Sequence, residues 1–133
     1  MHRKCGRLCA AGLDDCGAIS SIGVSFTVLN SLMSYNMALG IGANPARSGT
    51  PGGGNGGAIY NDGNTFTLTV CGSRLTDNTA NEGGGAIFFV SNDRSGNLLI
   101  DQSYLSNNPS LGFETDPGIF VLGNKQYTAS TIE

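Results

Sequence analysis

The stretch Gly56-Gly57-Ala58-Ile59-Tyr60 returns 28 residues further on as Gly84-Gly85-Ala86-Ile87-Phe88. Gly17-Ala18-Ile19 stands at the start of an earlier copy, and Pro117-Gly118-Ile119 occupies the same place in a later one. A segment that recurs at a spacing of roughly 20–50 residues is typical of a repeat protein. The chain is therefore expected to be built from copies of one structural unit.

A second pattern follows each of the first three copies. It consists of an apolar residue, a β-branched residue, a serine, a further apolar residue and an asparagine. The first apolar residues are Phe26, Leu68 and Leu98, the serines are Ser31, Ser73 and Ser103, and the asparagines are Asn36, Asn78 and Asn108. The distance from the isoleucine of the first pattern to the serine is 12, 14 and 16 residues in successive copies. Even increments preserve the face to which each side chain points, because side chains alternate along a strand.

Together the two patterns predict an all-β solenoid in which each repeat forms one coil of short strands. A single coil cannot bury its own apolar face, whereas stacked coils share a continuous interior. Equivalent residues then form columns along the axis, and the first apolar residues of the three patterns should form one of them. We expect Asn36, Asn78 and Asn108 to form a structural ladder of stacked amides at a turn, rather than a ligand site.

The repeats also define the organisation of the chain. Residues 1–16 show no periodicity and are interpreted as an irregular lead-in, and residues 17–122 as the coils. Residues from about 40 to 55 form a Gly/Pro-rich insertion that is unsuited to a regular helix or strand. The tail 123–133 is polar and lacks the serine–asparagine pattern, so about three coils and a partial fourth are expected.

The charge pattern argues against two classes of partner. Charged residues make up 13% of the 133 residues, and the formal net charge is −3. Arg3, Lys4 and Arg7 precede an acidic body, which disfavours contact with the phosphate backbone of nucleic acids. No run of about 18 apolar residues occurs, so no membrane span is predicted. The basic N-terminus is not followed by the apolar region of a normal signal peptide.

The cysteines do not indicate a metal centre. Cys5, Cys9 and Cys16 cluster near the N-terminus, with His2 as a further candidate ligand, and Cys71 lies far away. This spacing does not match the paired cysteines of structural zinc sites. No metal ligands are therefore assigned, and unpaired thiols or a disulfide are the favoured interpretation.

The Gly-Gly-Ala-Ile elements at 56–59 and 84–87, combined with the three patterns that end in asparagine, resemble right-handed parallel β-helix proteins of the pectin-lyase-like superfamily. They are most similar to the GGAI/FxxN repeats of bacterial polymorphic outer-membrane proteins and autotransporter passenger proteins. The apolar residue before the asparagine is Met33, Leu75 or Leu105 here, in place of phenylalanine. The resemblance covers roughly residues 17–122 and implies a right-handed parallel β-helix. It also implies an extracellular or cell-surface location and contact with polysaccharide or with other coils of the same protein.

The resemblance includes enzymes that cleave acidic polysaccharides with clustered Asp, Arg or Lys, in some cases with Ca²⁺. In this chain the candidates for a surface site are Asp62, Asp93 and Arg94, which fall in corresponding loops of neighbouring coils. They provide at most two carboxylates and one guanidinium, whereas Ca²⁺ requires about six to eight oxygen ligands and glycoside hydrolysis requires two carboxyls at a defined separation. These three residues are more simply interpreted as turn residues and solvated charges. No catalytic residue and no cofactor are assigned, and the resemblance leaves Ca²⁺ open as a ligand.

Two functions remain open at this stage. The first is a non-catalytic extracellular or surface segment, which serves as a scaffold, in adhesion or in weak glycan contact, within a longer β-helix protein. The alternative is a fragment of a polysaccharide lyase or glycoside hydrolase whose catalytic coils lie elsewhere or in the insertion at 40–55. Because the terminal coils of a solenoid have unpaired strand edges, self-association through open coil ends is also expected.

Overall fold

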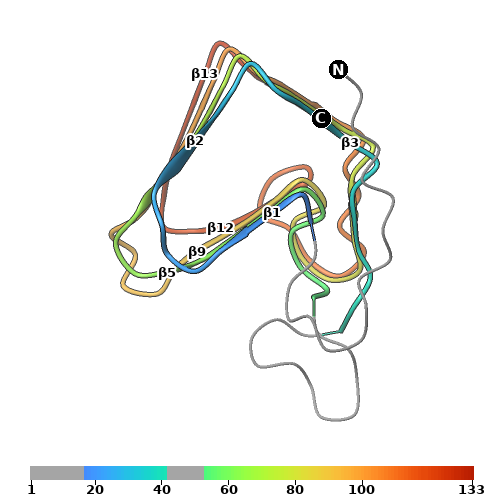
Figure 1. The fold of residues 1–133 in the computed structure, drawn as a ribbon, viewed down its shortest axis with the longest axis horizontal. Coiled ribbons are helices and arrows are strands. Elements are labelled where there is room, and N and C mark those ends of the chain that lie inside the picture. The colour runs from blue at the N-terminus through green and yellow to red at the C-terminus, as the bar shows by residue number, and fades with distance from the viewer. Residues whose placement is uncertain (1–16, 42–52) are drawn as a thin grey trace.

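The computed structural model describes residues 17–41 and 53–133, and these residues wind into a stack of β-coils (Figure 1). The expectations for residues 1–16 and for most of the insertion fall outside the described residues. The first coil contains β1 (Ile19–Ser21), β2 (Phe26–Leu29), β3 (Leu32–Ser34) and β4 (Met37–Ala38). The second contains β5 (Ile59–Gly63), β6 (Thr67–Cys71), β7 (Arg74–Thr76) and β8 (Thr79–Ala80). The third contains β9 (Ile87–Ser91), β10 (Asn97–Asp101) and β11 (Tyr104–Ser106), and the fourth β12 (Ile119–Leu122), β13 (Asn124–Thr128) and β14 (Thr131–Ile132).

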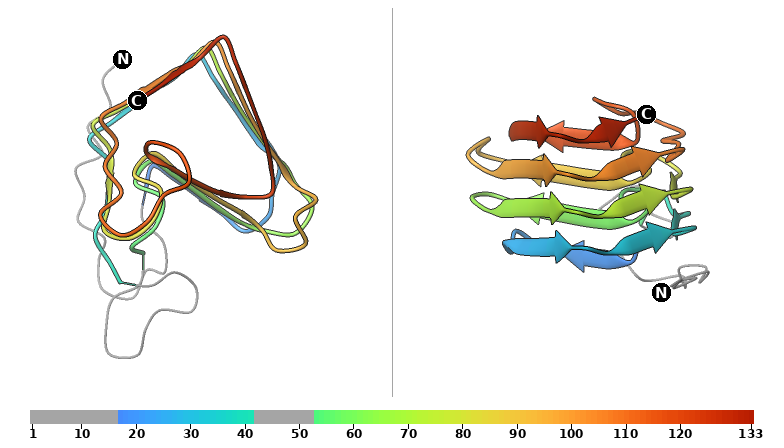
Figure 2. Two further views of the ribbon diagram at one scale, coloured as in Figure 1. Left: turned by 180° about the vertical axis from the view of Figure 1, so that it is seen from behind. Right: turned by 90° about the horizontal axis from the view of Figure 1, so that it is seen from above.

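Strands of successive coils pair in parallel and form the sides of the solenoid. Three four-stranded sheets have the orders β1-β5-β9-β12, β2-β6-β10-β13 and β3-β7-β11-β14, and β4 pairs with β8. Viewed from the end the coils share one outline, and from the side they lie one above another (Figure 2). The predicted fold class is confirmed: the described residues form an all-β parallel β-helix of about three coils with a partial fourth.

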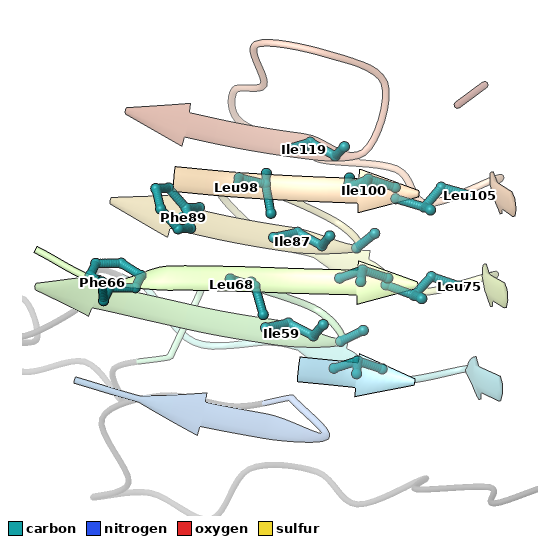
Figure 3. Packing of buried hydrophobic residues seen from close by; sticks show 14 residues of the cluster. Ile59, Phe66, Leu68, Leu75, Ile87, Phe89, Leu98, Ile100, Leu105 and Ile119 are labelled. Carbon is teal, nitrogen blue, oxygen red and sulfur yellow. The ribbon is translucent and has the colours of Figure 1, made fainter. Parts of the chain in front are cut away.

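The pairing register places equivalent residues in columns. Ile59 lies between Ile19 and Ile87 in the first sheet, and Leu68 lies between Phe26 and Leu98 in the second. Figure 3 shows the side chains of Ile59, Ile87, Leu68 and Leu98 pointing into the space between the sheets. The buried cluster consists of Val28, Ala58, Ile59, Phe66, Leu68, Val70, Leu75, Ala86, Ile87, Phe89, Leu98, Ile100, Leu105 and Ile119. The predicted columns are therefore confirmed, and burial of each large aliphatic side chain stabilises the fold by about 1.5–3 kcal/mol.

The repeated glycine pair marks a corner where neighbouring coils approach closely. A Cβ atom on Gly57 would overlap the carbonyl oxygen of Gly85, and one on Gly85 would overlap the carbonyl oxygen of Asn108. Gly56 and Gly84 have φ angles of 71° and 69°, a conformation that side chains disfavour. The corner therefore requires glycine for reasons of space and of backbone conformation.

The interpretation of residues 123–133 as a tail outside the coils is corrected by the structure. β13 pairs with β10, and β14 pairs with β11, so this segment continues the fourth coil. The Ser130 hydroxyl accepts a hydrogen bond from the Ser103 N–H at 3.1 Å, as Ser103 does from Ser73 in the coil below. Strand pairing uses the backbone, so polar side chains do not prevent it. Within the described residues, this segment supplies the edge strands β13 and β14 of two of the four sheets.

A polar cluster closes the interior at this last coil. Lys125 and Tyr127 continue the columns of Leu98 and Ile100, yet both side chains bind Asp116 from the crossing that precedes β12. The Lys125 ammonium lies 2.7 Å from Asp116, and the Tyr127 hydroxyl donates to the same carboxylate at 2.9 Å. Burial and this carboxylate raise the pKa of Tyr127 above its ordinary value. Inward-pointing charges of this kind protect a sheet edge from pairing with another chain.

Candidate functional site

The predicted surface candidates lie at one corner of the coils, Asp62 near the end of β5 and Asp93 and Arg94 in the turn that follows β9. Asp62 belongs to β5 and is aligned with Val90 in β9. Its carboxylate accepts hydrogen bonds from the Asn92 amide at 3.0 Å and from the Tyr60 hydroxyl at 3.2 Å. Asp62 therefore links the second coil to the third.

Asp93 forms the centre of a local turn network. Its carboxylate accepts hydrogen bonds from the hydroxyl and the N–H of Ser95 at 2.7 and 3.0 Å, and from the hydroxyls of Ser91 and Thr65 at 3.0 and 3.2 Å. These bonds, those of Ser95 first, lower the pKa of Asp93 from 3.8 to about 2 although the residue is solvent-exposed. Because four groups already donate to it, Asp93 holds the shape of the loop.

Arg94 follows Asp93 in the same turn. Its φ angle is 63°, and its N–H donates to the Ser91 carbonyl at 2.9 Å. In residues 17–41 and 53–133 the only ion pair joins Lys125 and Asp116, so the Arg94 guanidinium does not bridge either candidate carboxylate. The structure brings the loops of Asp62 and Asp93 onto neighbouring coils, but each carboxylate bonds to its own set of amides and hydroxyls.

The asparagine ladder is buried and continuous. The N–H and Nδ2 of Asn36 both donate to Asn78 Oδ1, at 3.0 and 2.9 Å. The same two groups of Asn78 donate to Asn108 Oδ1 at 3.1 and 2.9 Å. All three residues are at most 4% exposed. The structure thus shows the stacked, hydrogen-bonded amides that the sequence predicted.

The sheet β2-β6-β10-β13 presents a broad surface with few charges, which we call the outer face. Along each strand the residues of this face alternate with the buried residues of the columns. Their side chains therefore point away from the interior. The outer face consists of Thr27, Leu29, Thr67, Thr69, Cys71, Asn97, Leu99, Asp101, Asn124, Gln126 and Thr128. All of these side chains are exposed or half-buried. The strand alternation in the sequence could have identified this surface as a candidate site.

Two further contacts depend on side-chain geometry that the alignment of the coils alone does not give. Tyr60, Phe88 and Phe120 stack in successive coils, with ring centroids 5.1 and 5.3 Å apart. The Arg74 guanidinium lies 4.6 Å from the centre of the Tyr104 ring. The pairing registers predict that these residues are neighbours, whereas their side-chain geometry required the structure.

No metal centre is formed by the part of the chain that the structure describes. No group of three or more His, Cys, Asp or Glu side chains gathers there. Cys71 is a free, half-buried thiol, and Cys5, Cys9 and Cys16 lie outside the described residues. Among the described residues there is also no helix with the length and apolarity needed to cross a membrane.

The candidate site therefore has three parts: carboxylates that accept hydrogen bonds from neighbouring amides and hydroxyls, the buried asparagine ladder, and the outer face. No family model matches the chain, and neither a curated protein nor a solved structure is found to be similar to it.

Proposed function

We propose that this chain is a non-catalytic β-helix segment that acts outside the cell or at its surface, as a scaffold, in adhesion or in weak glycan contact. The observation that carries this proposal is the outer face. Threonine, asparagine and glutamine side chains occupy most positions of two neighbouring rows there, which Leu99 interrupts, and the strands of successive coils are about 4.8 Å apart. A regular surface of hydroxyls and amides suits many weak polar contacts with an extended chain such as a polysaccharide.

The chemistry of the candidate carboxylates supports the same proposal. A general acid or base needs a carboxyl that is free to exchange a proton near the operating pH. Asp93 is held ionised down to low pH by its four donors, and Asp62 bonds to Asn92 and Tyr60. Both groups thus support loops, which is the role expected in a scaffold.

The proposal includes membership of this chain in the pectin-lyase-like superfamily, among the β-helix proteins with GGAI/FxxN repeats that its sequence resembles. It is supported by the parallel coils, the buried asparagine ladder and the tight glycine corners at Gly57 and Gly85. In this setting the partners are polysaccharides or further coils, and self-association through coil ends belongs to the same proposal.

Binding to a panel of immobilised acidic and neutral polysaccharides tests the role of the outer face. We expect weak, saturable retention that is lost on Thr69→Glu, which places a carboxylate in the centre of this face. Thr76→Glu on β7 is the matched control, since it adds the same charge to a different sheet. Equal retention of the two variants, or no retention on any polysaccharide, would contradict the proposal.

A second candidate is a fragment of a polysaccharide lyase or hydrolase. It is favoured by one observation, that Asp62 near the end of β5 and Asp93 in the turn after β9 lie at the same corner of neighbouring coils. Release of unsaturated or reducing ends from polygalacturonate or alginate, with and without Ca²⁺, would support this alternative. The activity should then be lost in Asp62→Asn.

A further inference from the structure

The first positions of β6, β10 and β13 form one row of the outer face, which we call the amide row (Thr67, Asn97 and Asn124). Asn97 pairs with Thr67 on one side and with Asn124 on the other. Asn97 is half-buried and Asn124 is exposed. Strands of successive coils lie about 4.8 Å apart, so the row runs along the axis of the coils.

The amide nitrogens of this row are bound to the loop that precedes β10. Asn97 Nδ2 donates to the Ser95 carbonyl at 3.4 Å, and Asn124 Nδ2 donates to the carbonyls of Arg94 and Gly96, both at 3.3 Å. A carbonyl oxygen only accepts hydrogen bonds, so the nitrogen must be the atom of each amide on the loop side. Each Oδ1 is then turned away from the loop, and no group within residues 17–41 and 53–133 donates to it.

The two free oxygens make the amide row a set of hydrogen-bond acceptors. An amide oxygen has two lone pairs and needs N–H or O–H partners. Because the loop holds both amides, binding a ligand costs them less side-chain ordering than it would cost a mobile side chain. The hydroxyls of Thr67 and Thr69 beside them can accept or donate. A ligand that fits this row must therefore carry hydrogen-bond donors.

The charges around the outer face disfavour an anionic ligand. Asp101 is the only charged side chain of this face, at the far end of β10. Lys125 lies on the same sheet, but it continues an interior column and its ammonium is 2.7 Å from Asp116. Arg94, in the turn before β10, directly follows Asp93 and adds no net charge to that edge. A uronate or sulfate group would bring negatively charged oxygens that only accept, and the outer face has no cation to pair with them.

The middle of the outer face offers an apolar contact. Leu99 is half-buried and lies between Thr69 of β6 and Gln126 of β13. A neutral sugar unit carries hydroxyls around its rim and C–H groups on its faces. Such a unit can donate to an amide oxygen while its C–H groups contact Leu99. The face therefore combines acceptors, hydroxyls and apolar surface, the complement of an uncharged sugar.

We propose that the outer face selects a neutral polysaccharide, whose hydroxyl groups donate hydrogen bonds to Asn97 Oδ1 and Asn124 Oδ1. This inference rests on the glycan contact proposed above, and it assigns the class of ligand and the residues that determine it. A chain that runs along the axis meets the two oxygens with neighbouring sugar units, since the spacing of about 4.8 Å is close to the length of one unit in an extended polysaccharide.

Two pairs of soluble polysaccharides test this selection, because the members of each pair share a backbone and differ in charge. The pairs are hydroxyethylcellulose with carboxymethylcellulose, and fully methyl-esterified polygalacturonate with the de-esterified polymer. Affinity electrophoresis of the full chain, in gels that contain each polymer, gives the dissociation constants. We expect the neutral member of a pair to bind about three- to tenfold more tightly, the factor that corresponds to about one hydrogen bond.

Variants of the outer face identify the residues responsible. The double variant Asn97→Leu, Asn124→Leu removes both acceptors and should weaken binding of the neutral polymers at least about fivefold. Gln126→Leu is the matched control on the same face and should change the binding less than about twofold, since it leaves the amide row intact. Asp101→Asn should strengthen binding of the anionic polymers about two- to threefold and leave the neutral polymers unchanged.

A measurement on the natural chain keeps the test independent of how the variants fold. On titration with cellohexaose, the side-chain amide resonances of Asn97 and Asn124 should shift, with the amide resonance of Thr76 on β7 as the internal reference. Shifts confined to other residues would overturn the assignment. Equal or tighter binding of the anionic members, or unchanged binding by the double variant, would overturn the inference and leave the glycan contact itself intact. Absence of binding to all four polymers would contradict the proposed glycan contact together with this inference.

Discussion

Replacing Asn78 by alanine tests the ladder most directly, because Asn78 is its middle member. The Asn78 side chain is fully buried and takes part in four hydrogen bonds. Its Oδ1 accepts from the N–H and Nδ2 of Asn36, and its Nδ2 donates to the Met33 carbonyl and to Asn108 Oδ1. The four distances lie between 2.9 and 3.0 Å.

The expected cost follows from this count. Each hydrogen bond contributes about 0.5–1.5 kcal/mol net, and a buried partner left unsatisfied costs about 1–3 kcal/mol. Asn78→Ala should therefore lower the free energy of unfolding by about 3–5 kcal/mol. Asn36→Ala provides the matched control, because this side chain donates one bond and its own buried Oδ1 has no partner among the described residues. Its replacement should cost about 1 kcal/mol or less.

Urea unfolding followed by circular dichroism measures both values, and an unchanged dependence on urea concentration shows that the variants unfold from the same fold. Asn108→Ala should fall between them, since it loses two accepted bonds and one donated bond. A cost for Asn36→Ala equal to or above that for Asn78→Ala would refute the reasoning. It would mean that the ladder bonds do not set the stability of this turn.

Three further predictions use the same measurements. Leu75→Ala should cost about 2–5 kcal/mol because Leu75 is fully buried, whereas Thr67→Ala on the outer face should stay within about 0.5 kcal/mol, and the reverse order would contradict the assigned faces. Gly85→Ala should be the most damaging of these changes, since its Cβ would overlap the Asn108 carbonyl oxygen, and a variant as stable as the natural chain would show that the corner can relax. Ionised Asp93 stabilises the folded state at neutral pH because its pKa is lowered to about 2. This contribution is lost as the pH falls from about 4 to about 2, so the difference in thermal midpoint between the natural chain and Asp93→Asn should close over that interval, and a constant difference would contradict it.

The columns of the fold could be predicted from the sequence because they rest on two simple regularities. Side chains alternate along a strand, and loop lengths that differ by two residues keep Phe26, Leu68 and Leu98 on the same face. β13 could not be predicted in this way, because its inward positions carry Lys125 and Tyr127 in place of aliphatic residues. Its pairing depends on the backbone of β10, which leaves no trace in an apolar pattern.

The candidate site was less accessible to sequence reasoning for a related reason. The sequence predicted Asp62 and Asp93 in corresponding loops, whereas Asp62 lies in β5 opposite Val90 and Asp93 lies in the turn after β9, and the sequence does not encode which hydroxyls and amides reach their oxygens. The network around Asp93 depends on the turn geometry, in which Arg94 has a positive φ angle.

The two ends of the coil stack differ in chemistry, and this difference determines how further coils can be added. At the first coil, Ile19 and Phe26 are half-buried members of the interior columns, and the buried Asn36 Oδ1 atom has no hydrogen-bond partner within residues 17–41 and 53–133. At the last coil the corresponding column ends in Lys125, which pairs with Asp116. Head-to-tail stacking of two copies would place this charged pair against the Phe26 column, and burying charges against apolar groups is costly. A coil added below the first would instead continue an apolar interior, and an asparagine in it would donate its N–H and Nδ2 to Asn36. The proposed association through coil ends therefore favours a partner coil with the pattern of this chain's own first three coils over the polar end of a second copy.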